Sequence, residues 1–449
     1  MNEKVLSELR TFFAAGETRS IPFRLAALAK LDEFLAANEE EFLKALETDF
    51  GKPRLESYMS EFLFLRQEIK LVRKNLRKWL RPKRASNPPY FWPMRSRIER
   101  QPFGVVLIFS PWNYPLQLAL SPLIAAVAAG NTVLLKPSEL TPASEAFLVR
   151  LISEVFPPGW VNTVTGDGSV ASRLLEEEFD FIFFTGSTEN GRKVAEAAAK
   201  NLTPTLLELG GKCPVIVDET ADPEITARRI WVGKLFNAGQ TCLAPDFVAV
   251  HEKLRDPLLA ALEKTLADAP WEKEMARIVN ERHYERLSAY PTDNLVLQKG
   301  EDSPADRHFA PRLVHVEDRQ HPLLKEEIFG PILPVITYKD GEDFRETLTP
   351  LGKPLVTYAF SKDEDFFKRL KSTFATGSFC FNDTIKQAAN LKLPFGGVGA
   401  SGHGRYRGRY GVESLSYTCP VSKRYFLPDP VDMVPPKEER FETLRKWLK

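Results

Sequence analysis

The first part of the chain separates into helical stretches and a proline-rich connector. Apolar residues recur at helical spacing over 22–50 and 55–80, which predicts helices there. Residues 81–103 interrupt this pattern with several prolines, and a short strand is expected at 95–100. The N-terminal part is therefore expected to be helical and to end at an irregular connector.

From residue 104 onward, short apolar runs alternate with helical stretches. The pattern predicts strands at 105–109, 132–136, 160–164 and 179–184, and helices at 116–129, from 142, at 169–177 and at 187–200. Alternating strands and helices predict a parallel sheet that is covered on both faces. Such a sheet binds ligands beyond the carboxyl ends of its strands.

A second α/β unit is expected to begin near Glu208. It includes predicted strands at 213–218, 247–251 and 332–338 and a helix at 223–238. The glycine-rich segment 394–411 is interpreted as a loop. The sequence thus predicts an α/β fold with two doubly wound parallel-sheet domains.

Composition narrows the class of protein. The 449 residues suffice for roughly two or three domains. Hydrophobic residues make up 43% and charged residues 27%, as in an ordinary globular protein, and the formal net charge is +1. Because nucleic-acid-binding proteins usually show a basic excess, nucleic acid is not expected as a partner.

The cysteines and the apolar runs indicate a cytoplasmic protein. None of the four cysteines forms a C-x-x-C pair, so free thiols in a reducing cytosol are a simpler interpretation than a zinc site or a disulfide scaffold. The most apolar stretch, 116–129, is shorter than the about 20 residues that a membrane span needs. The N-terminus has no signal-peptide core.

One cysteine lies in a segment typical of a loop. Cys242 belongs to NAGQTCLAP (237–245), between Gly239 and Pro245 and just past a predicted helix. Turns of this kind leave backbone N–H groups free to stabilise a thiolate or an oxyanion. A lone cysteine is more often a small buried hydrophobe, but the polar neighbours here weaken that alternative.

Polar side chains follow several predicted strands. Glu208, in LLELGGK (206–212), lies between two leucines, where a carboxylate is costly unless it is paired or acts as a general base. The alternative is a strand residue that faces solvent. Asn113, in FSPWNYP (109–115), has an amide that can donate to an oxyanion, or it is a turn residue.

Two further strand ends suit an anionic or sugar-containing ligand. Lys136 and Glu139, in LLKPSE (134–139), are placed to reach a ribose or a phosphate, or they are solvated loop charges. Gly186 and Ser187, in FFTGS, open a helix whose N-terminus suits an anionic group. The segment is not a G-x-G-x-x-G fingerprint, so alone it is a weak signal.

Together these segments resemble a known family. In chain order, PWNYP, LLKPSE, FFTGS, LTPTLLELGGK, NAGQTC, EEIFGPILP and LPFGGVGASGHGRYRG are similar to the signatures of the aldehyde dehydrogenase superfamily. The chain is most similar to the class 3 branch, which acts on fatty and aromatic aldehydes and shares its length and the LPFGGVG-x-SG-x-G-x-Y-x-G ending. The matches span residues 103 to 411.

The resemblance implies a catalytic role for three residues. Cys242 is implied to be the nucleophile, which forms a thiohemiacetal and then a thioester, and Asn113 to line the oxyanion hole. Glu208 is implied to activate the water that hydrolyses the thioester. The implied activity is the NAD(P)-dependent oxidation of an aliphatic (medium- or long-chain) or aromatic aldehyde to the carboxylic acid.

The resemblance also implies the cofactor, and no metal site is expected. Class 3 relatives use NAD and often accept NADP as well. A glutamate at position 139 suits a ribose 2′-hydroxyl and repels a 2′-phosphate, which favours NAD. The residues implied to contact the cofactor are Lys136, Glu139, Gly186, Ser187, Glu327 and Phe329.

The division into domains follows from the same resemblance. Residues 1–80 and 104–207 are expected to form the NAD(P)-binding domain, and residues 208–410 the catalytic domain. A bridging and oligomerisation element of a homodimer is expected from 81–103 and 411–426. Residues 427–449 would form a C-terminal tail.

Some segments depart from common family versions. Glu189 adds a negative charge near the expected position of the pyrophosphate, and TIKQAANLK (384–392) is expected to border the substrate entrance. Val232 and Phe236 lie four residues apart on the helix before Cys242. They are expected to line an apolar pocket with Tyr114 or to pack in the core.

Other functions stay open from the sequence alone. One is a family member that uses coenzyme A as the acyl acceptor, although some such relatives lack the base found here as Glu208. Another is a non-catalytic protein on the same fold, against which the joint presence of Cys242, Glu208 and Asn113 argues. The basic stretch 66–100 is interpreted as a solvated helix face and connector, with nucleic acid or an acidic membrane as the alternative.

Overall fold

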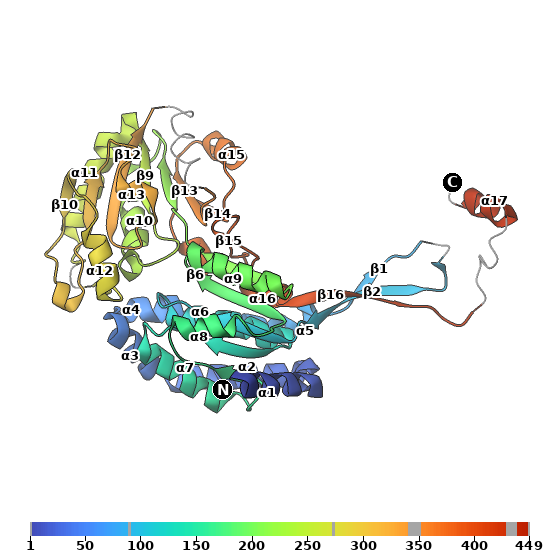
Figure 1. Cartoon of the computed structure of the whole chain (residues 1–449). Helices are drawn as coiled ribbons and strands as arrows, with labels where there is room; N and C mark the ends of the chain where they lie inside the picture. The colour runs from blue at the N-terminus through green and yellow to red at the C-terminus, as the bar shows by residue number, and fades with distance from the viewer. Residues whose placement is uncertain (1, 89–90, 272–273, 340–351, 428–437, 448–449) are drawn as a thin grey trace.

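The computed structural model describes residues 2–88, 91–271, 274–339, 352–427 and 438–447 (Figure 1). Figure 1 shows a body that contains two sheets and an arm of strands that extends from it toward the C-terminus. Of the predicted tail, residues 428–437 and 448–449 lie outside the described residues, and Glu438–Trp447 forms helix α17.

The first sheet has the strand order β15-β7-β6-β3-β4-β5. Its strands pair in parallel, except that β15 runs antiparallel to β7. The strands are β3 (Val105–Phe109), β4 (Thr132–Lys136), β5 (Val161–Thr163), β6 (Phe181–Gly186), β7 (Thr205–Leu209) and β15 (Gly402–His403). The predicted strands at 105–109, 132–136, 160–164 and 179–184 are confirmed.

Helices cover both faces of this sheet because the side chains of β3 alternate between two cores. Val105 and Leu107 pack in a core with residues of α1 (Asn2–Ala15), α8 (Gly168–Leu174) and α9 (Thr188–Lys200). Val106 and Ile108 pack on the other face with residues of α2 (Ile21–Ala37), α5 (Leu63–Trp79), α6 (Pro115–Ala129) and α7 (Pro142–Val155). Burial of each such side chain stabilises the fold by about 1.5–3 kcal/mol relative to exposure.

The second sheet has the strand order β10-β11-β12-β9-β8-β13-β14, and only its edge pair β10–β11 is antiparallel among the described strands. The strands are β8 (Pro214–Val217), β9 (Phe247–His251), β10 (Leu295–Gln298), β11 (Arg312–His315), β12 (Ile332–Tyr338), β13 (Val356–Phe360) and β14 (Ser378–Phe381). Helices of this part are α10 (Pro223–Leu235), α11 (Arg255–Asp268), α12 (Glu281–Ser288), α13 (Pro322–Lys325) and α15 (Glu364–Thr373). The predicted α/β fold with two mainly parallel sheets is confirmed.

The arm joins segments that lie far apart in the sequence. It is an antiparallel sheet of β1 (Lys83–Ala85), β2 (Arg95–Pro102) and β16 (Ser416–Lys423). The register runs from Ser416 opposite Pro102 to Lys423 opposite Arg95. The two stretches expected to form a bridging element therefore pair with each other, and the strand expected at 95–100 is confirmed.

Strand β7 crosses the domain boundary predicted between residues 207 and 208. It pairs with β6 along its length, with Thr185 opposite Glu208. Glu208 thus lies in the first sheet, although the residues that follow it build the second. The division into domains itself stays a prediction.

The segment 394–411 is not only a loop, contrary to the sequence prediction. It contains β15, which pairs with β7, and the start of α16 (Gly408–Ser414). Gly402 makes the pairing possible, since its φ is 120° and a Cβ there would lie 2.0 Å from the carbonyl oxygen of Leu207. The close approach of the two backbones requires a glycine.

The N-terminal helical stretches are interrupted where the chain must turn. Residues 22–50 form α2 and α3 (Glu39–Phe50), which are separated at Asn38. Residues 55–80 form α4 (Arg54–Ser57), a π-helical segment at Tyr58–Phe62, and α5. The buried residues Ile69, Val72 and Leu76 of α5 lie opposite exposed basic side chains, as their helical spacing predicts.

Candidate active site

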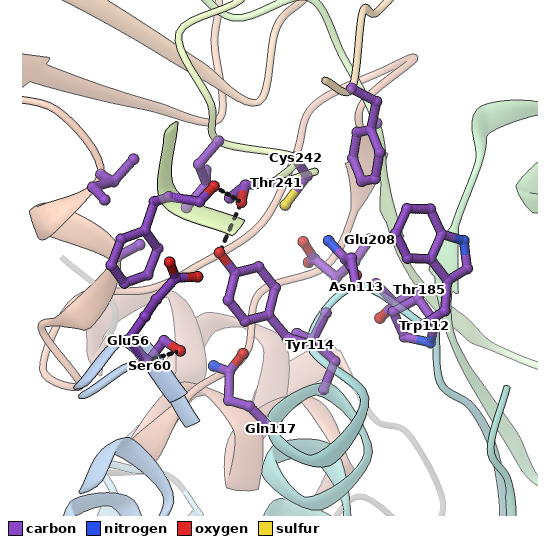
Figure 2. A pocket seen from close by; sticks show the side chains of 18 of the residues that line it. Glu56, Ser60, Trp112, Asn113, Tyr114, Gln117, Thr185, Glu208, Thr241 and Cys242 are labelled. Atoms are coloured by element: carbon purple, nitrogen blue, oxygen red, sulfur yellow. Dashed lines mark hydrogen bonds between the residues drawn. The ribbon is translucent and has the colours of Figure 1, made fainter. Parts of the chain in front are cut away.

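A cavity of about 980 Å³ lies between the two α/β units (Figure 2). One wall comes from the carboxyl ends of β3, β6 and β7, which contribute Asn113, Gly186 and Glu208. The other unit contributes Cys242 and Glu327. The volume is typical of a small-molecule site, and its place at the carboxyl ends of parallel strands agrees with the sequence prediction.

The loop before Cys242 has an unusual backbone. Helix α10 ends at Leu235, and a short helical turn follows over Phe236–Gly239. Asn237, Ala238 and Gly239 all have a positive φ, of 54°, 53° and 74°. Non-glycine residues rarely adopt this region, so the surrounding contacts must hold them there.

Hydrogen bonds from the other unit hold this loop. The backbone N–H of Asn237 donates to Glu56 Oε1 at 2.8 Å, and its side-chain Nδ2 donates to the carbonyl oxygen of Asn113 at 2.8 Å. Gln240 Nε2 donates to the carbonyl oxygen of Arg277 at 2.9 Å. The loop that carries Cys242 is therefore tied to both walls of the cavity.

Asn113 is buried beside the cysteine loop. Its Nδ2 donates to the carbonyl oxygen of Gln240 at 3.0 Å, so one amide hydrogen is used for the loop. The amide carries a second N–H, which is free to donate to another acceptor. Figure 2 shows the side chains of Asn113, Glu208 and Cys242 together on the cavity wall.

Glu208 is buried, and no hydrogen bond from the described residues replaces the water lost from its carboxyl group. Its side chain is 3% exposed, and neither carboxyl oxygen has a hydrogen-bond partner among the described residues. Burial raises the pKa of Glu208 to about 8, opposed by the positive charges of Arg407 and then Arg405. The carboxyl group has space because residue 396 is a glycine. A Cβ at that position would lie 2.9 Å from Glu208 Oε1.

Cys242 is half-buried on the cavity wall. Burial raises the pKa of its thiol to about 12, and the negative charges of Glu327 and Glu208 raise it further. Arg407 acts in the opposite direction. At neutral pH the resting thiol is therefore protonated, and any nearby positive charge increases the small thiolate fraction.

Glu327 and Phe329 lie on the cavity wall as a rigid pair. Burial, followed by repulsion from Asp246, raises the pKa of Glu327 to about 8. A Cβ on Gly210 would lie 2.2 Å from Glu327 Oε2, so that glycine is needed for the carboxyl group to fit. Phe329 has a φ of 49° and packs edge-on against Trp112, with ring centroids 5.3 Å apart.

A buried ion pair supports this segment. Lys212, the last residue of LELGGK, pairs with Asp246 and donates to the carbonyl oxygen of Glu326 at 2.8 Å. Asp246 Oδ1 accepts the backbone N–H of Ile328 at 3.0 Å. The segment that carries Glu327 is thus fixed to the strand ends next to Cys242.

Lys136 and Glu139 form a separate site at the end of β4. Lys136 Nζ lies 2.9 Å from Glu139 Oε2. Lys136 is buried, whereas Glu139 is exposed, and neither is among the described residues that line the cavity. They lie at the carboxyl edge of the first sheet, beyond the strand that leads to Asn113.

Gly186 and Ser187 line the cavity at the start of α9. Ser187 caps this helix, because its Oγ accepts the backbone N–H of Asn190 at 3.3 Å. Glu189 is exposed, and its Oε1 lies 2.7 Å from Lys193 Nζ. The extra negative charge that the sequence placed near a pyrophosphate is therefore balanced on the outer surface of the helix.

The expected apolar wall is present. Val232, Phe236 and Tyr114 all line the cavity, as do Ile385 and several of its neighbours in the predicted entrance segment 384–392. Tyr114 OH lies 2.7 Å from Thr241 Oγ1. Val232 and Phe236 thus line a cavity with Tyr114, as expected, whereas the role of 384–392 at a substrate entrance stays a prediction.

Glu56 and Arg407 are among the cavity residues that the sequence analysis missed. Glu56 lies on α4, and burial raises the pKa of its carboxyl group to about 7. Arg407 lies within the glycine-rich motif and is 5% exposed. Nothing in the local sequence around Glu56 indicates a site residue. Arg407, by contrast, lies between Tyr406 and Gly408 inside the motif that resembles the family, so the sequence could have indicated it.

Comparisons with known proteins agree with this architecture. The model of the aldehyde dehydrogenase family matches residues 3–420. The 4,4'-diaponeurosporen-aldehyde dehydrogenase of Staphylococcus aureus (strain NCTC 8325 / PS 47) is 40% identical over 456 residues, which cover 100% of this chain and 99% of that protein. Aldehyde dehydrogenase family 3 member H1 of Arabidopsis thaliana is 40% identical over 442 residues, or 96% of this chain and 91% of that protein.

A solved structure agrees as well. The substrate-bound state of Staphylococcus aureus AldH has a TM-score of 0.96 and 39% identity, and the match covers 100% of both chains. The chain belongs to the aldehyde dehydrogenase family, and the predicted resemblance to its class 3 branch is confirmed. It is an oxidoreductase that converts aldehydes to acids.

Two further observations concern the described residues only. They contain no group of three or more His, Cys, Asp or Glu residues that could hold a metal ion. Among the helices that they form, none is both long and apolar enough to cross a membrane.

Proposed function

We propose that the chain catalyses the NAD(P)-dependent oxidation of a hydrophobic aldehyde, aliphatic with a medium or long chain or aromatic, to the carboxylic acid. The observation that carries this proposal is the meeting of Cys242, Asn113 and Glu208 in one cavity from both α/β units. The mostly apolar entrance, with Val232, Phe236 and neighbours of Ile385, supports a hydrophobic substrate.

Cys242 is the nucleophile of the proposed reaction. Its thiolate attacks the aldehyde carbon, which gives a thiohemiacetal on the sulfur. The loop hydrogen bonds to Glu56 and Asn113 hold the sulfur at a constant position while the substrate enters. Preorganisation of this kind lowers the barrier because the reacting groups need not be reoriented.

Asn113 stabilises the oxygen that becomes negative during the attack. One of its amide hydrogens is bound to Gln240, and the other is available to donate to the oxyanion. Since the amide is buried and fixed, its dipole is already oriented when the charge develops. A single donor of this kind is worth about 2.7–4 kcal/mol of transition-state stabilisation.

Glu208 acts in the second half of the reaction. Its carboxyl group lies in the same cavity and has no protein partner among the described residues, so it is free to bind a water. As a carboxylate it takes a proton from that water, and the resulting hydroxide attacks the thioester and releases the acid. Water is thus the proposed acyl acceptor, rather than coenzyme A.

The cavity, together with the neighbouring end of β4, fits a dinucleotide cofactor. Lys136 and Glu139 would hold the adenosine ribose. Gly186 and Ser187 would meet the pyrophosphate at the start of α9, where the buried Thr185 Oγ1 has no hydrogen-bond partner among the described residues. Glu327 and Phe329 would hold the nicotinamide ribose beside Cys242. When bound, NAD(P)+ accepts the hydride of the thiohemiacetal carbon, which leaves a thioester on the cysteine. Glu139 favours NAD over NADP.

The finer points of this assignment are also proposals. A homodimer would be built on the arm of β1, β2 and β16, which projects from the body (Figure 1). The free thiols of all four cysteines support a reducing compartment, the cytoplasm. Neither nucleic acid nor a metal is proposed as a partner.

The test is the formation of NADH or NADPH with a panel of aldehydes, with Cys242→Ala and Cys380→Ala as a matched pair of cysteine variants. We expect Cys242→Ala to lose at least about 10⁴-fold in kcat/KM, because the covalent intermediate cannot form. Cys380→Ala is expected to retain activity. Formation of the acid, measured beside the reduced cofactor, checks that water is the acceptor.

Equal activity in both variants would overturn the assignment of Cys242. Reduced cofactor that forms only in the presence of coenzyme A would replace water by that thiol as the acceptor. No turnover with any aldehyde by a protein with a reduced thiol would point to a non-catalytic role.

A further inference from the structure

We propose that Arg407 is a positioning residue whose fixed, buried guanidinium stabilises the anionic forms of both Cys242 and Glu208. The proposal rests on the proposed function, since it takes these two as the reacting groups. Arg407 lies on the wall of the same cavity and is 5% exposed.

The backbone of Arg407 adopts a strained conformation, which the surrounding contacts must stabilise. Its φ is 82° and its ψ is 135°, a region in which side chains other than glycine are strained. The preceding residue, Tyr406, forms an antiparallel bridge with Phe395, and Gly408 begins α16. Tertiary contacts on both sides therefore impose this conformation on the chain.

The side chain is fixed by stacking and by one hydrogen bond. Arg407 Cζ lies 4.0 Å from the ring centroid of Phe395 and 4.8 Å from that of Phe64. A terminal nitrogen donates to the carbonyl oxygen of Ala388, and Nε has no hydrogen-bond partner among the described residues. These contacts place a rigid planar cation in an apolar wall.

No carboxylate neutralises this cation within ion-pair distance among the described residues. The acid of the adjacent helix, Glu68, accepts the backbone N–H of Gly408 at 2.8 Å and the hydroxyl of Ser121 at 2.6 Å. Burial raises the pKa of Glu68, and Arg407 opposes that effect. A buried cation without an ion-pair partner strongly favours any negative charge that develops in the same low-dielectric cavity.

Different charged groups act on Glu208 and on Cys242. Glu208 is faced by Arg407 and Arg405, whereas Cys242 is faced by Glu327, Glu208 and Arg407. Arg407 lowers the pKa of both groups. It therefore opposes the two carboxyl groups that disfavour the thiolate.

The neighbouring arginine is used differently. Arg405 Nη1 donates to the carbonyl oxygens of Gly397 and Gly404, both at 2.6 Å. Its hydrogen bonds thus stabilise the glycine-rich loop. Arg409, two residues beyond Arg407, is exposed and pairs with Glu413 at 2.9 Å, so it offers a matched control of the same residue type.

The experiment measures the rate at which iodoacetamide alkylates Cys242, as a function of pH and without cofactor. Mass spectrometry of the peptide that carries Cys242 separates this thiol from the other three. We expect Arg407→Gln to be alkylated about tenfold more slowly than the wild type at pH 8, which corresponds to a rise of about one unit in the pKa of the thiol. Arg407→Lys, which retains the charge, is expected within about threefold of the wild type, and Arg409→Gln is expected to be unchanged.

An unchanged alkylation rate in folded Arg407→Gln would overturn the proposal. If that variant does not fold, Arg407→Lys decides alone, because a purely structural role predicts slow alkylation there too. A tenfold loss in folded Arg407→Lys would overturn the proposal in the same way. Since alkylation needs neither aldehyde nor cofactor, failure of the dehydrogenase assay affects the proposed function and leaves this result interpretable.

Discussion

The ends of β4 and β7 look alike in the sequence but differ in the structure. Each is an apolar strand of the first sheet that ends near a glutamate and a lysine. After β4, Glu139 is exposed and its carboxylate lies 2.9 Å from Lys136. In β7, Glu208 is 3% exposed and its carboxyl group has no partner among the described residues.

The difference separates a group suited to holding a ligand from a group suited to reaction. The exposed carboxylate of Glu139, beside Lys136, offers a hydrogen-bond acceptor at the end of β4. A desolvated, unpaired carboxyl group has its pKa displaced toward neutrality, where it can exchange a proton during a catalytic cycle. The environment, rather than the residue type, distinguishes the two roles.

Replacement of Glu208 is expected to give the largest effect of this comparison. Glu208→Gln cannot activate water, so we expect turnover to fall by about 10²–10⁴-fold. Attack by Cys242 does not use this side chain as a base in the proposed mechanism, and the first turnover should survive as a burst of reduced cofactor. Rapid-mixing measurements of that burst, beside steady-state rates, provide the check.

The matched control for this variant is Glu139→Gln, which removes the same charge from the end of β4. At saturating cofactor it should retain the steady-state turnover and the burst behaviour of the wild type. A Glu208→Gln protein that turns over at the wild-type rate would remove the distinction between the two strand ends.

The pH dependence of turnover tests whether burial causes the difference between Glu208 and Glu139. Because burial raises the pKa of Glu208 to about 8, turnover limited by thioester hydrolysis should rise by about tenfold per pH unit below pH 8 and level off above it. The dependence is measured as kcat from pH 6 to pH 9.5. A kcat that is already constant from pH 6 upward would mean that Glu208 has an ordinary pKa.

The raised pKa of Glu208 also makes the free energy of unfolding depend on pH. The pKa of Glu208 is raised in the folded state above the unfolded value of about 4.3. Its contribution to stability is therefore full below about pH 4 and is lost as the pH rises through about 8. Glu208→Gln cannot ionise, so at pH 9 it should have a free energy of unfolding at least about 1 kcal/mol above that of the wild type.

The smallest effect is expected at the end of β4. Glu139 is exposed, and the buried Lys136 Nζ also donates to the carbonyl oxygen of Pro137 at 3.0 Å, so loss of the ion pair in Glu139→Gln should cost about 1 kcal/mol and lower the melting temperature only slightly. Loss of the carboxylate removes its repulsion of a 2′-phosphate. We expect the ratio of kcat/KM for NAD+ to that for NADP+ to fall by about 3–10-fold, measured with one aldehyde and both cofactors. An unchanged ratio would show that Glu139 does not face the ribose.

The local elements and the order of the motifs could be predicted from the amino-acid sequence. The strands at 105–109 and 132–136 follow from short apolar runs, and the helix that begins at Pro142 follows from a cap signal, because these patterns act over a few residues. The motif around Cys242 indicated a reactive loop for a similar local reason. Resemblance to the family then supplied the roles expected of Glu208 and Asn113.

Properties that depend on distant neighbours arise only in the folded chain. Gly402 pairs with Glu208, and Glu56 binds the N–H of Asn237, across long stretches of sequence. Glu208 becomes buried, and Arg407 stacks on Phe64, when the N-terminal helices, β7 and the glycine-rich segment pack together. Desolvation and charge interaction are sums over everything within a few ångströms, so no local pattern in the sequence contains them.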